Sequence, residues 1–474
     1  MPYTHTTWTA LQTALSQRLQ DTAQNFWTAT EIPLYLSEAL RTFGVLSGFW
    51  RERATLTLTA STAFFDLMTQ TVGFPTLTTL IGSAVTDRDI IQLVQFALLE
   101  SASDQATWPG TAQFTYNDVS NAVIRRRNQF LADTGIILTR STQAVSSPAI
   151  GRAVLGDTII DVRRCAFQGA TPFDYYSTMW RTDERELVLA DSSWNVNSGT
   201  PRAFSVLGPP PLLLQMAPPP LASGTLDLVT VNASPTLDPA TSATALGIPD
   251  DLTPAIKWGV LADLLGIDGQ SRDPARASFC EQRYQQFVQL ARMLPLVVNA
   301  EIQGASTIPT TLADLDNAVP NWQNVTGTPS YLALAGWNLL AVYPVADGSG
   351  PYSATVDVVR KAPIPTVNSP DVQLGREQLD MILDYAEHLA LFKVGGYEFA
   401  VTARQADNFL VQSITYNQRL AASARYIIAP KRSSQREKEF VPRRSQSDGL
   451  GAMPSIQEAQ SFVTANVPER LRER

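Results

Sequence analysis

The chain has 474 residues, of which 44% are hydrophobic and 17% are charged, with a net charge of −8 and a pI near 5.0. This length exceeds one ordinary hydrophobic core, so we expect about two to four domains. The acidic balance argues against a general nucleic-acid binder, which needs a basic face to neutralise phosphates.

Several other classes of protein are also disfavoured. No run of about eighteen apolar residues occurs, so no membrane span is expected. The first residues lack the cationic and apolar parts of a signal peptide, so we expect assembly in the cytoplasm. Cys165 and Cys280 are too few for a disulfide framework and are expected to be buried thiols. With only His5 and His388, a His-based zinc site and His-dependent catalysis have little basis.

The first 150 residues are predicted to form a helical region with a short β element. Apolar residues at helical spacing predict helices over residues 8–20, 31–45, 87–99 and 117–132. Strict alternation over residues 53–59 predicts a half-buried strand.

A basic run, Arg125, Arg126 and Arg127, lies in the last of these helices. One interpretation is a solvated helix face, or pairing with acids nearby in the same chain. The other is a contact with an acidic neighbouring subunit, which makes the three arginines subunit-interface candidates. A DNA-specific site is not expected, because no interleaved aromatics accompany them.

Residues 151–295 are predicted to form an α+β module. Strands are expected at 157–163, 212–216 and 224–231, and a short amphipathic helix at 171–189. The strand at 212–216 lies between prolines at 209–211 and 218–220, and proline cannot donate to a ladder, so this strand is predicted at a sheet edge. Two amphipathic helices follow, one opened by Ile248-Pro-Asp-Asp and one by Asp273-Pro274.

The candidate reactive sites in this module are weak. Residues 266–273 are rich in carboxylates but lack the ligand spacing of a calcium loop, so an interhelical turn is expected. Helical spacing does not aim Asp183, Glu184 and Glu186 at one point. No phosphate-binding, nucleophile-elbow, C-x-x-C or H-E-x-x-H motif occurs, so we expect no catalytic residues, no metal site, no cofactor and no enzyme activity.

An internal repeat links this module to residues 296–430. Trp194 and Trp322 each precede a Gly-x-Pro turn with the same spacing, at Gly199 and Gly327. After each turn come an apolar stretch ending in proline, a glycine-bounded strand and two helices. We therefore predict an α+β fold built from two adaptor-type modules, with small antiparallel sheets and an internal duplication. Chance similarity in a chain rich in Ala, Leu and Thr is the alternative.

The last segment, residues 431–474, is predicted to be a flexible basic arm. It contains few apolar residues and many Ser and charged residues, so it lacks a core of its own. A disordered tail without a role is one interpretation, and an arm that orders on a partner is the other.

The order of these elements resembles the tail-connector, or head-tail adaptor, proteins of tailed bacteriophages. The resemblance rests on the Trp and Gly-Thr-Pro turn, the Leu-rich run into Pro-Pro, the Ile-Pro-Asp start and the Asp-Pro between the helices. It covers residues 157–293 best and 322–424 more faintly.

The resemblance implies a structural virion protein, located at the head-tail neck. It implies a homo-oligomeric ring of twelve copies that joins the portal protein to tail and neck proteins. Double-stranded DNA would pass through the lumen without specific binding, which an acidic channel favours. The arm would then reach the portal or a neighbouring ring. Its candidate contact residues are Lys431, Arg432, Arg436, Lys438, Phe440, Arg443 and Arg444.

Two alternatives stay open. The same modules would suit a tail nozzle or baseplate component. A carbohydrate- or receptor-binding tail protein is the other alternative, with Trp194, Trp322 and Trp337 exposed for stacking on sugars.

Overall fold

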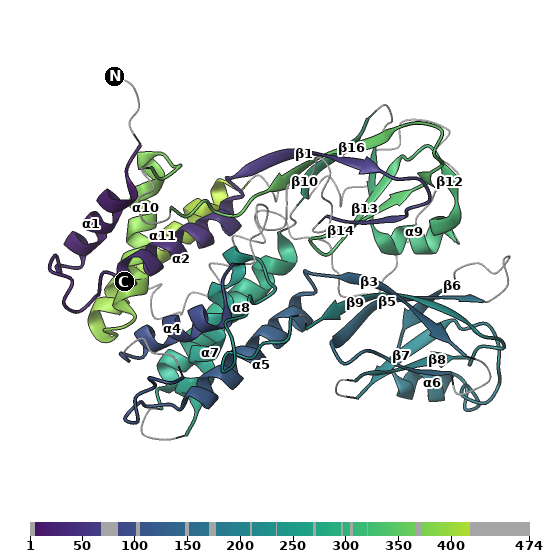
Figure 1. Ribbon diagram of the computed structural model, residues 1–474, viewed down its shortest axis with the longest axis horizontal. Coiled ribbons are helices and arrows are strands. Elements are labelled where there is room, and N and C mark those ends of the chain that lie inside the picture. The colour runs from purple at the N-terminus through teal and green to yellow at the C-terminus, as the bar shows by residue number, and fades with distance from the viewer. Residues whose placement is uncertain are drawn as a thin grey trace.

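The computed structural model describes residues 5–67, 84–100, 105–146, 151–169, 177–208, 211–233, 235–268, 272–294, 297–303, 307–319, 321–365 and 371–417. These ranges contain helices and mostly antiparallel sheets, so the protein is α+β, as predicted. The long helices gather at one end of an elongated molecule and the sheets at the other (Figure 1). The arm predicted at 431–474, with all its candidate contact residues, lies outside the described residues.

Polar residues start many of the helices. The long helices are α1 (Trp8–Arg18), α2 (Glu31–Ser47), α4 (Asp87–Ala97), α5 (Tyr116–Thr134), α7 (Pro254–Gly266), α8 (Pro274–Met293), α10 (Arg376–Leu391) and α11 (Gly396–Thr415). The side chains of Thr7, Thr86, Thr115 and Asp273 each accept a hydrogen bond from the backbone N–H three residues later. Such caps satisfy amide groups that a helix start leaves unpaired. Asp183 and Thr311 cap the short helices α6 (Glu184–Ala190) and α9 (Leu312–Ala318) in the same way.

One sheet has seven strands in the order β3-β9-β5-β6-β7-β8-β4. They are β3 (Thr139–Val145), β4 (Arg152–Val154), β5 (Ile159–Gly169), β6 (Ser177–Arg181), β7 (Ala203–Leu207), β8 (Leu213–Ala217) and β9 (Gly224–Asn232). The long strand β9 pairs along its length with β3 and β5.

The other strands form two larger sheets and a short pair. The order β1-β16-β10 joins β1 (Arg51–Leu58), β16 (Tyr352–Val359) and β10 (Val297–Ile302). The order β11-β13-β14-β2 joins β11 (Ile308–Thr310), β13 (Tyr331–Ala335), β14 (Leu339–Tyr343) and β2 (Phe64–Asp66). The short strands β12 (Thr326–Gly327) and β15 (Val345–Ala346) pair with each other.

These pairings divide the described chain into two units. The continuous unit comprises residues 84–294. The split unit comprises residues 5–67 and 297–417, whose two parts are joined because β1 pairs with β16 and β2 pairs with β14. In the sequence, the continuous unit therefore lies between the two parts of the split unit.

The two units have the same order of elements. Helices α4, α5, α6, α7 and α8 of the continuous unit occupy the places of α1, α2, α9, α10 and α11 in the split unit. Strands β3-β9-β5 have the neighbours of β1-β16-β10, and β6-β7-β8-β4 have those of β11-β13-β14-β2. The strand directions agree as well: β6 is parallel to β7, and β11 is parallel to β13.

Equivalent residues can be paired at several places. Between the units, Glu184 and Leu312, Trp194 and Trp322, and Ala203 and Tyr331 are all separated by the same number of residues. Helices α5 and α2 end at Gly135 and Gly48, which share a left-handed conformation with φ of 58° and 56°. The cap residues Thr86 and Thr7 form isolated bridges with Ala245, which precedes α7, and with Asp371, which precedes α10. The similarity thus extends beyond the order of elements.

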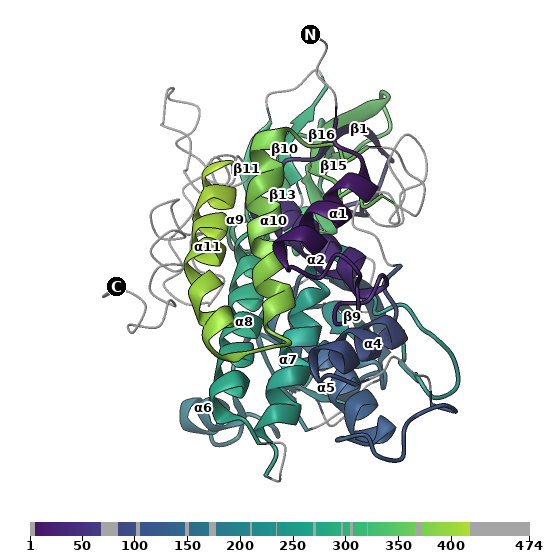
Figure 2. The same ribbon diagram turned by 90° about the vertical axis from the view of Figure 1, so that its left-hand side faces the viewer.

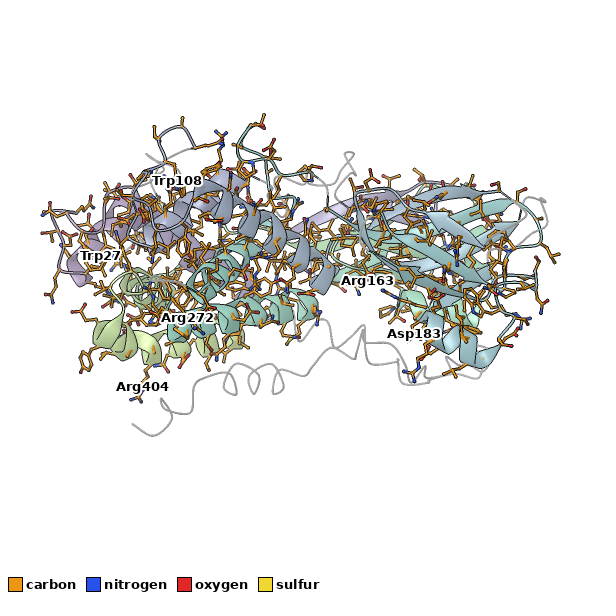
Figure 3. All side chains as sticks on the ribbon, turned by 90° about the horizontal axis from the view of Figure 1, so that it is seen from below. Trp27, Trp108, Arg163, Asp183, Arg272 and Arg404 are labelled. Carbon is orange, nitrogen blue, oxygen red and sulfur yellow. The ribbon has the colours of Figure 1, made fainter. Side chains whose placement is uncertain are left out.

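Both units point the same way. In Figure 1 the split unit lies above the continuous unit, with the helices of both at the left and the sheets of both at the right. Figure 2 shows the helical end. Figure 3 shows from below how the helices and the sheets lie at opposite ends, with Trp27, Trp108, Arg272 and Arg404 at the helical end and Asp183 at the sheet end. One hydrophobic cluster includes helices of both units and the sheets of the split unit. The sheet of the continuous unit has a cluster of its own, which includes Val162, Phe167, Leu214 and Leu226.

Most predicted elements are present, including the first four helices and the strand at 53–59. Strand β8 is present too, but the prediction that it lies at a sheet edge is wrong. It pairs with β7 on one side and with β4 on the other, so the flanking prolines indicated where the strand ends and not its place in the sheet. In the described part of residues 171–189, the single helix predicted there is strand β6 followed by α6.

The predicted boundary at residue 150 separates strands that pair with each other, whereas the boundary at 295 coincides with the end of the continuous unit. Residues 1–150 contribute β1 and β2 to the sheets of the split unit and β3 to the sheet of the continuous unit. The reason is that each unit begins with two helices, and these precede the repeat that was visible in the sequence.

Two equivalent glycines give a test of how the units pack. A Cβ at Gly336, where φ is +62°, would lie 2.8 Å from the Ile136 carbonyl oxygen, in the other unit. A Cβ at Gly208, where φ is +83°, would meet no described heavy atom within 4 Å. Both alanine variants bear the left-handed cost of about 1–2 kcal/mol, and we expect Gly336→Ala to lose distinctly more unfolding free energy than Gly208→Ala. Equal losses in urea denaturation would contradict this packing.

Candidate functional site

Buried polar and aromatic groups gather at the contact between the two units. At the helical end, Lys257 of α7 and Glu38 of α2 form an ion pair in which both side chains are buried. The other carboxylate oxygen of Glu38 accepts a 3.0 Å hydrogen bond from the indole N–H of Trp258. The Lys257 ammonium also lies 4.0 Å from the centre of the Trp258 ring. Removal of either charge would leave a buried ion without its partner.

An aromatic cluster continues this contact along α8. Phe279 of α8 packs edge-on against Phe399 and is stacked with Phe392, both of the split unit, with ring centres 5.2 and 6.0 Å apart. Arg276, one turn earlier, donates a 3.1 Å hydrogen bond to the Phe392 carbonyl and covers its ring. One stripe of α8 therefore faces the split unit.

His388 of α10 is buried beside this cluster. Its ring stacks on Phe399 at 4.3 Å, and its Nδ1 lies 3.0 Å from the Thr402 hydroxyl. Burial, together with the nearby charge of Arg283, lowers the pKa of His388 to about 3. The imidazole is thus neutral at physiological pH and serves as a packing group.

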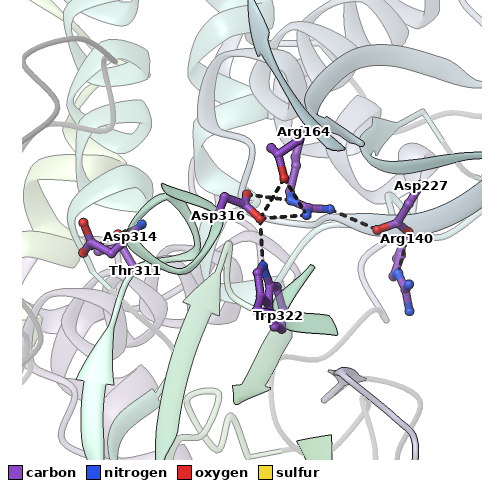
Figure 4. A network of polar contacts seen from close by, with 8 residues as sticks. Arg140, Arg164, Asp227, Thr311, Asp314, Asp316 and Trp322 are labelled. Atoms are coloured by element: carbon purple, nitrogen blue, oxygen red, sulfur yellow. Dashed lines mark hydrogen bonds and ion pairs between the residues drawn. The ribbon is translucent and has the colours of Figure 1, made fainter. Parts of the chain in front are cut away.

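At the sheet end, Arg164 of β5 crosses between the units (Figure 4). Its guanidinium binds both oxygens of Asp316 on α9, at 2.7 and 2.8 Å, and Asp227 on β9 at 3.0 Å. Burial lowers the pKa of Arg164, but the bonds and charges of Asp316 and Asp227 outweigh it, so the pKa is raised. The arginine stays charged and ties α9 of the split unit to the sheet of the continuous unit.

Two neighbours complete this network. Trp322 donates its indole N–H to Asp316 at 2.8 Å, and Arg140 of β3 donates to Asp227 at 2.6 Å. Asp316 also accepts a 3.2 Å hydrogen bond from Thr178, so it has three donor residues, whereas Asp227 is fully buried between two arginines. Charge-assisted bonds of this kind are stronger than neutral ones and fix orientation.

The turn between β13 and β14 forms the third part of the contact. The backbone N–H of Trp337 donates to the Ile136 carbonyl at 2.6 Å, and its indole N–H donates to the Ala291 carbonyl at 3.1 Å. The Asn338 side chain bonds both the N–H and the carbonyl of Leu138, at 2.9 and 2.8 Å. This turn binds the junction of α5 and β3 much as a further strand would.

The arginine run on α5 is used mainly within the chain. Arg126 binds both oxygens of Asp263, and Arg125 also binds Asp263, at 2.6 Å. Arg127 is buried and donates to the Pro235 carbonyl at 2.8 Å, and burial lowers its pKa to about 10. Of the two interpretations of the arginine run, pairing with acids in the same chain applies to Arg125 and Arg126. The Arg125 side chain is still 61% exposed.

The three tryptophans considered for sugar binding are buried. Trp194, Trp322 and Trp337 are 7%, 1% and 5% exposed, so the expectation of exposed stacking platforms is wrong. Trp194 belongs to a small cluster with Leu187, Trp322 donates to Asp316 in its own unit, and Trp337 donates across the unit contact to Ala291. Tryptophans beside the Gly-x-Pro turns are core anchors in this fold.

The carboxylates singled out in the sequence are placed as local structure. Asp183 caps α6, and Glu186 accepts a hydrogen bond from Thr182. In the described part of residues 266–273, Asp268 pairs with Arg272 at 2.9 Å and Asp273 caps α8. Among the described residues, no group of three or more His, Cys, Asp or Glu side chains is placed to hold a metal ion.

Both cysteines are buried thiols, and a small cavity lies at the helical contact. Burial raises the pKa of Cys280 to about 12 and also raises that of Cys165, so both thiols are protonated. A cavity at the helical contact, lined by Tyr35, Lys257, Trp258 and Phe392 among others, has a volume of about 10 Å³. That is near the minimum for one water molecule. No described helix is long and apolar enough to cross a membrane.

Comparison with known proteins does not place the chain in a family. No protein-family model matches it, and no curated protein matches it.

The sequence did not indicate the unit contact. Glu38, Lys257, Asp316 and Arg164 are far apart in the chain, and none belongs to a motif. A charged residue on the apolar stripe of a predicted helix was the available signal. Glu38 on α2 and Lys257 on α7 both carry it, since each lies among buried apolar neighbours.

The effect of the ion pair between Glu38 and Lys257 on the free energy of unfolding can be measured. We expect Glu38→Gln to lower the free energy of unfolding by about 3–5 kcal/mol, because Lys257 would stay buried without a counter-charge. The matched control is Arg53→Gln, which breaks the exposed pair between Arg53 and Asp357 and should have a much smaller effect. Equal effects of the two variants in urea denaturation would refute the burial of this pair.

The buried imidazole predicts a pH dependence of stability. The folded-state pKa of His388 lies below its ordinary value of 6.5, so the unfolded chain binds a proton that the folded chain does not. The contribution of His388 to the free energy of unfolding is fully present above about pH 6.5 and is lost as the pH drops. The slope from this group approaches about 1.4 kcal/mol per pH unit. Urea denaturation between about pH 7 and pH 5 should show this loss, and His388→Gln should reduce the slope. An unchanged slope would show that His388 does not cause it.

Proposed function

We propose that the protein is a structural component of a tailed-phage virion, which forms a ring at the head-tail neck between the portal and the tail. The observation that carries the proposal is the contact between two like-ordered units that point the same way. Units of this kind, packed side by side, suit a protein that acts by shape. The low number of candidate reactive groups in the described residues is consistent with such a role.

We also propose that the two units arose by duplication, with the continuous unit inserted into a loop of the split unit. The same separation between equivalent residues from α6 to β7 supports this, as do the paired glycine caps and threonine bridges. The termini of the continuous unit are joined to the ends of β2 and β10, so insertion needs only one pair of connections.

The electrostatics are compatible with passage of DNA. A net charge of −8 leaves few counter-charges for phosphates, so a duplex would not adhere to an acidic lumen. In this proposal the basic arm at 431–474 reaches the portal or a neighbouring ring. The body of the protein forms the ring, and the arm fixes its position.

The proposed role predicts the defect of a phage that cannot make this protein. We expect heads that fill with DNA but carry no stable tail and lose their genome, because nothing joins the portal to the tail. Electron microscopy of particles from a knockout phage, with complementation as the control, would measure this. Complete tailed particles that retain DNA but fail to adsorb would instead favour the receptor-binding alternative.

A further inference from the structure

We propose that neighbouring chains associate head to tail, and that the contact between chains reproduces the contact between the two units within a chain. The partner is a second copy of this chain. The surface that binds it consists of the positions, in each unit, that are equivalent to positions buried between the units. Three parts of the molecule carry this inference.

The first part is the outer face of α5. Constant spacing to the glycine caps makes Arg125 equivalent to Glu38 and Gln129 equivalent to Thr42. Glu38 is 4% exposed because Lys257 and Trp258 of the continuous unit cover it. Thr42, one turn later, is 1% exposed and bonds Tyr385 of α10 in its own unit. Arg125 and Gln129 are exposed. The continuous unit therefore exposes on α5 the face that is equivalent to the buried face of α2 in the split unit.

The second part is the outer stripe of α11. Helices α8 and α11 have equal lengths, so Phe279 and Arg283 are equivalent to Val401 and Gln405. Arg283 is buried and Phe279 packs on the aromatic cluster of the split unit. Val401 is 55% exposed, and Gln405 is also exposed. The split unit thus exposes on α11 the stripe that is equivalent to the stripe of α8 that packs on the split unit.

The third part is at the sheet end. Ile136 is 2% exposed because the turn at Gly336 lies on it, whereas its equivalent Phe49 is 45% exposed. The turn at Gly208, equivalent to that at Gly336, contacts no described residue that would obstruct a Cβ. Asp316 has a 9% exposed side chain, and its equivalent Val188 is 50% exposed. Each free apolar residue corresponds to a residue of the unit contact.

These faces are complementary and not alike. The continuous unit exposes copies of the surfaces that α2, α9 and the Gly336 turn offer it, and the split unit exposes copies of the surfaces that α8 and the α5–β3 junction offer. A contact between different faces propagates from chain to chain and closes into a ring when the rotation allows. A two-fold dimer, which joins identical faces, would leave this complementarity unused.

One consequence concerns the number of chains. A ring of such chains contains twice as many units as chains. For the number alone the inference rests on the proposed function: if the neck presents twelve equivalent positions, six chains would supply them. The chain-to-chain contact itself follows from the geometry of the two units.

A cysteine pair tests the contact. A Cβ at Gly336 would lie 3.1 Å from Leu138 Cγ, and the equivalents of these residues are Gly208 and Arg51. The variant Arg51→Cys/Gly208→Cys should form a ladder of covalent oligomers under mild oxidation. Cys165 and Cys280 are buried and do not interfere. Each single variant alone should stay monomeric on a denaturing gel, and a mixture of the two should give dimers only.

The helical end provides a matched pair of variants. Val401→Arg should abolish the ladder in the double-cysteine protein, whereas Ala400→Arg, at a neighbouring exposed position outside the stripe, should leave it unchanged. Circular dichroism should show all variants folded. Covalent dimers of a single-cysteine variant would indicate contacts between like faces and overturn the inference, as would a double variant that stays monomeric at high concentration. Neither experiment involves the portal, so failure here leaves the neck position to the knockout.

Discussion

The pairing of β1 with β16 is the constraint on which the rest of the structure depends. It joins residues 51–58 to residues 352–359 in a continuous antiparallel register, from Arg51 opposite Val359 to Leu58 opposite Tyr352. The whole continuous unit lies between these strands in the chain, so both of its ends lead back to the split unit. Such long-range pairing is costly in chain entropy, and the burial of the cluster shared by both sets of helices offsets that cost.

This constraint ties the continuous unit to the split unit at both of its ends. The two units lie side by side, with helices beside helices and sheets beside sheets (Figure 1). The contact contains charged groups at both ends, Glu38 with Lys257 and Arg164 with Asp316. Buried pairs of this kind contribute orientation more than net stability. They fix one arrangement of two units that could otherwise slide along their apolar faces.

The sequence allowed a good prediction of local structure and a poor one of long-range organisation. The helices at 87–99 and 117–132 were predictable because capping threonines and apolar spacing act within a few residues. The repeat of Trp194 and Trp322 was also visible, since both tryptophans fill equivalent core positions. The split of one unit around the other was not, because strand pairing between residues 51–58 and 352–359 leaves no local signal. The prolines beside β8 were misleading for the same reason: they report on the ends of a strand and not on its neighbours.

The contact residues were missed on similar grounds. Arg164 lies one residue beyond the strand predicted at 157–163, its partner Asp316 is on a helix that the sequence did not indicate, and no spacing connects them. The arginine run on α5 is visible in the sequence because its members are adjacent. In the fold, only Arg125 of the three keeps a largely exposed side chain. Physical proximity, which decides what a charge does, arises from the fold.

The central claim is that contacts between chains repeat the contact within the chain. It is tested most directly by comparing the number of chains in the assembled particle with the number of lobes around it. Native mass spectrometry gives the first number, and rotational analysis of end-on electron micrographs gives the second. The account predicts a closed ring with two similar lobes for each chain. A ring with one lobe per chain, in which only one of the two units meets a neighbour, would contradict it.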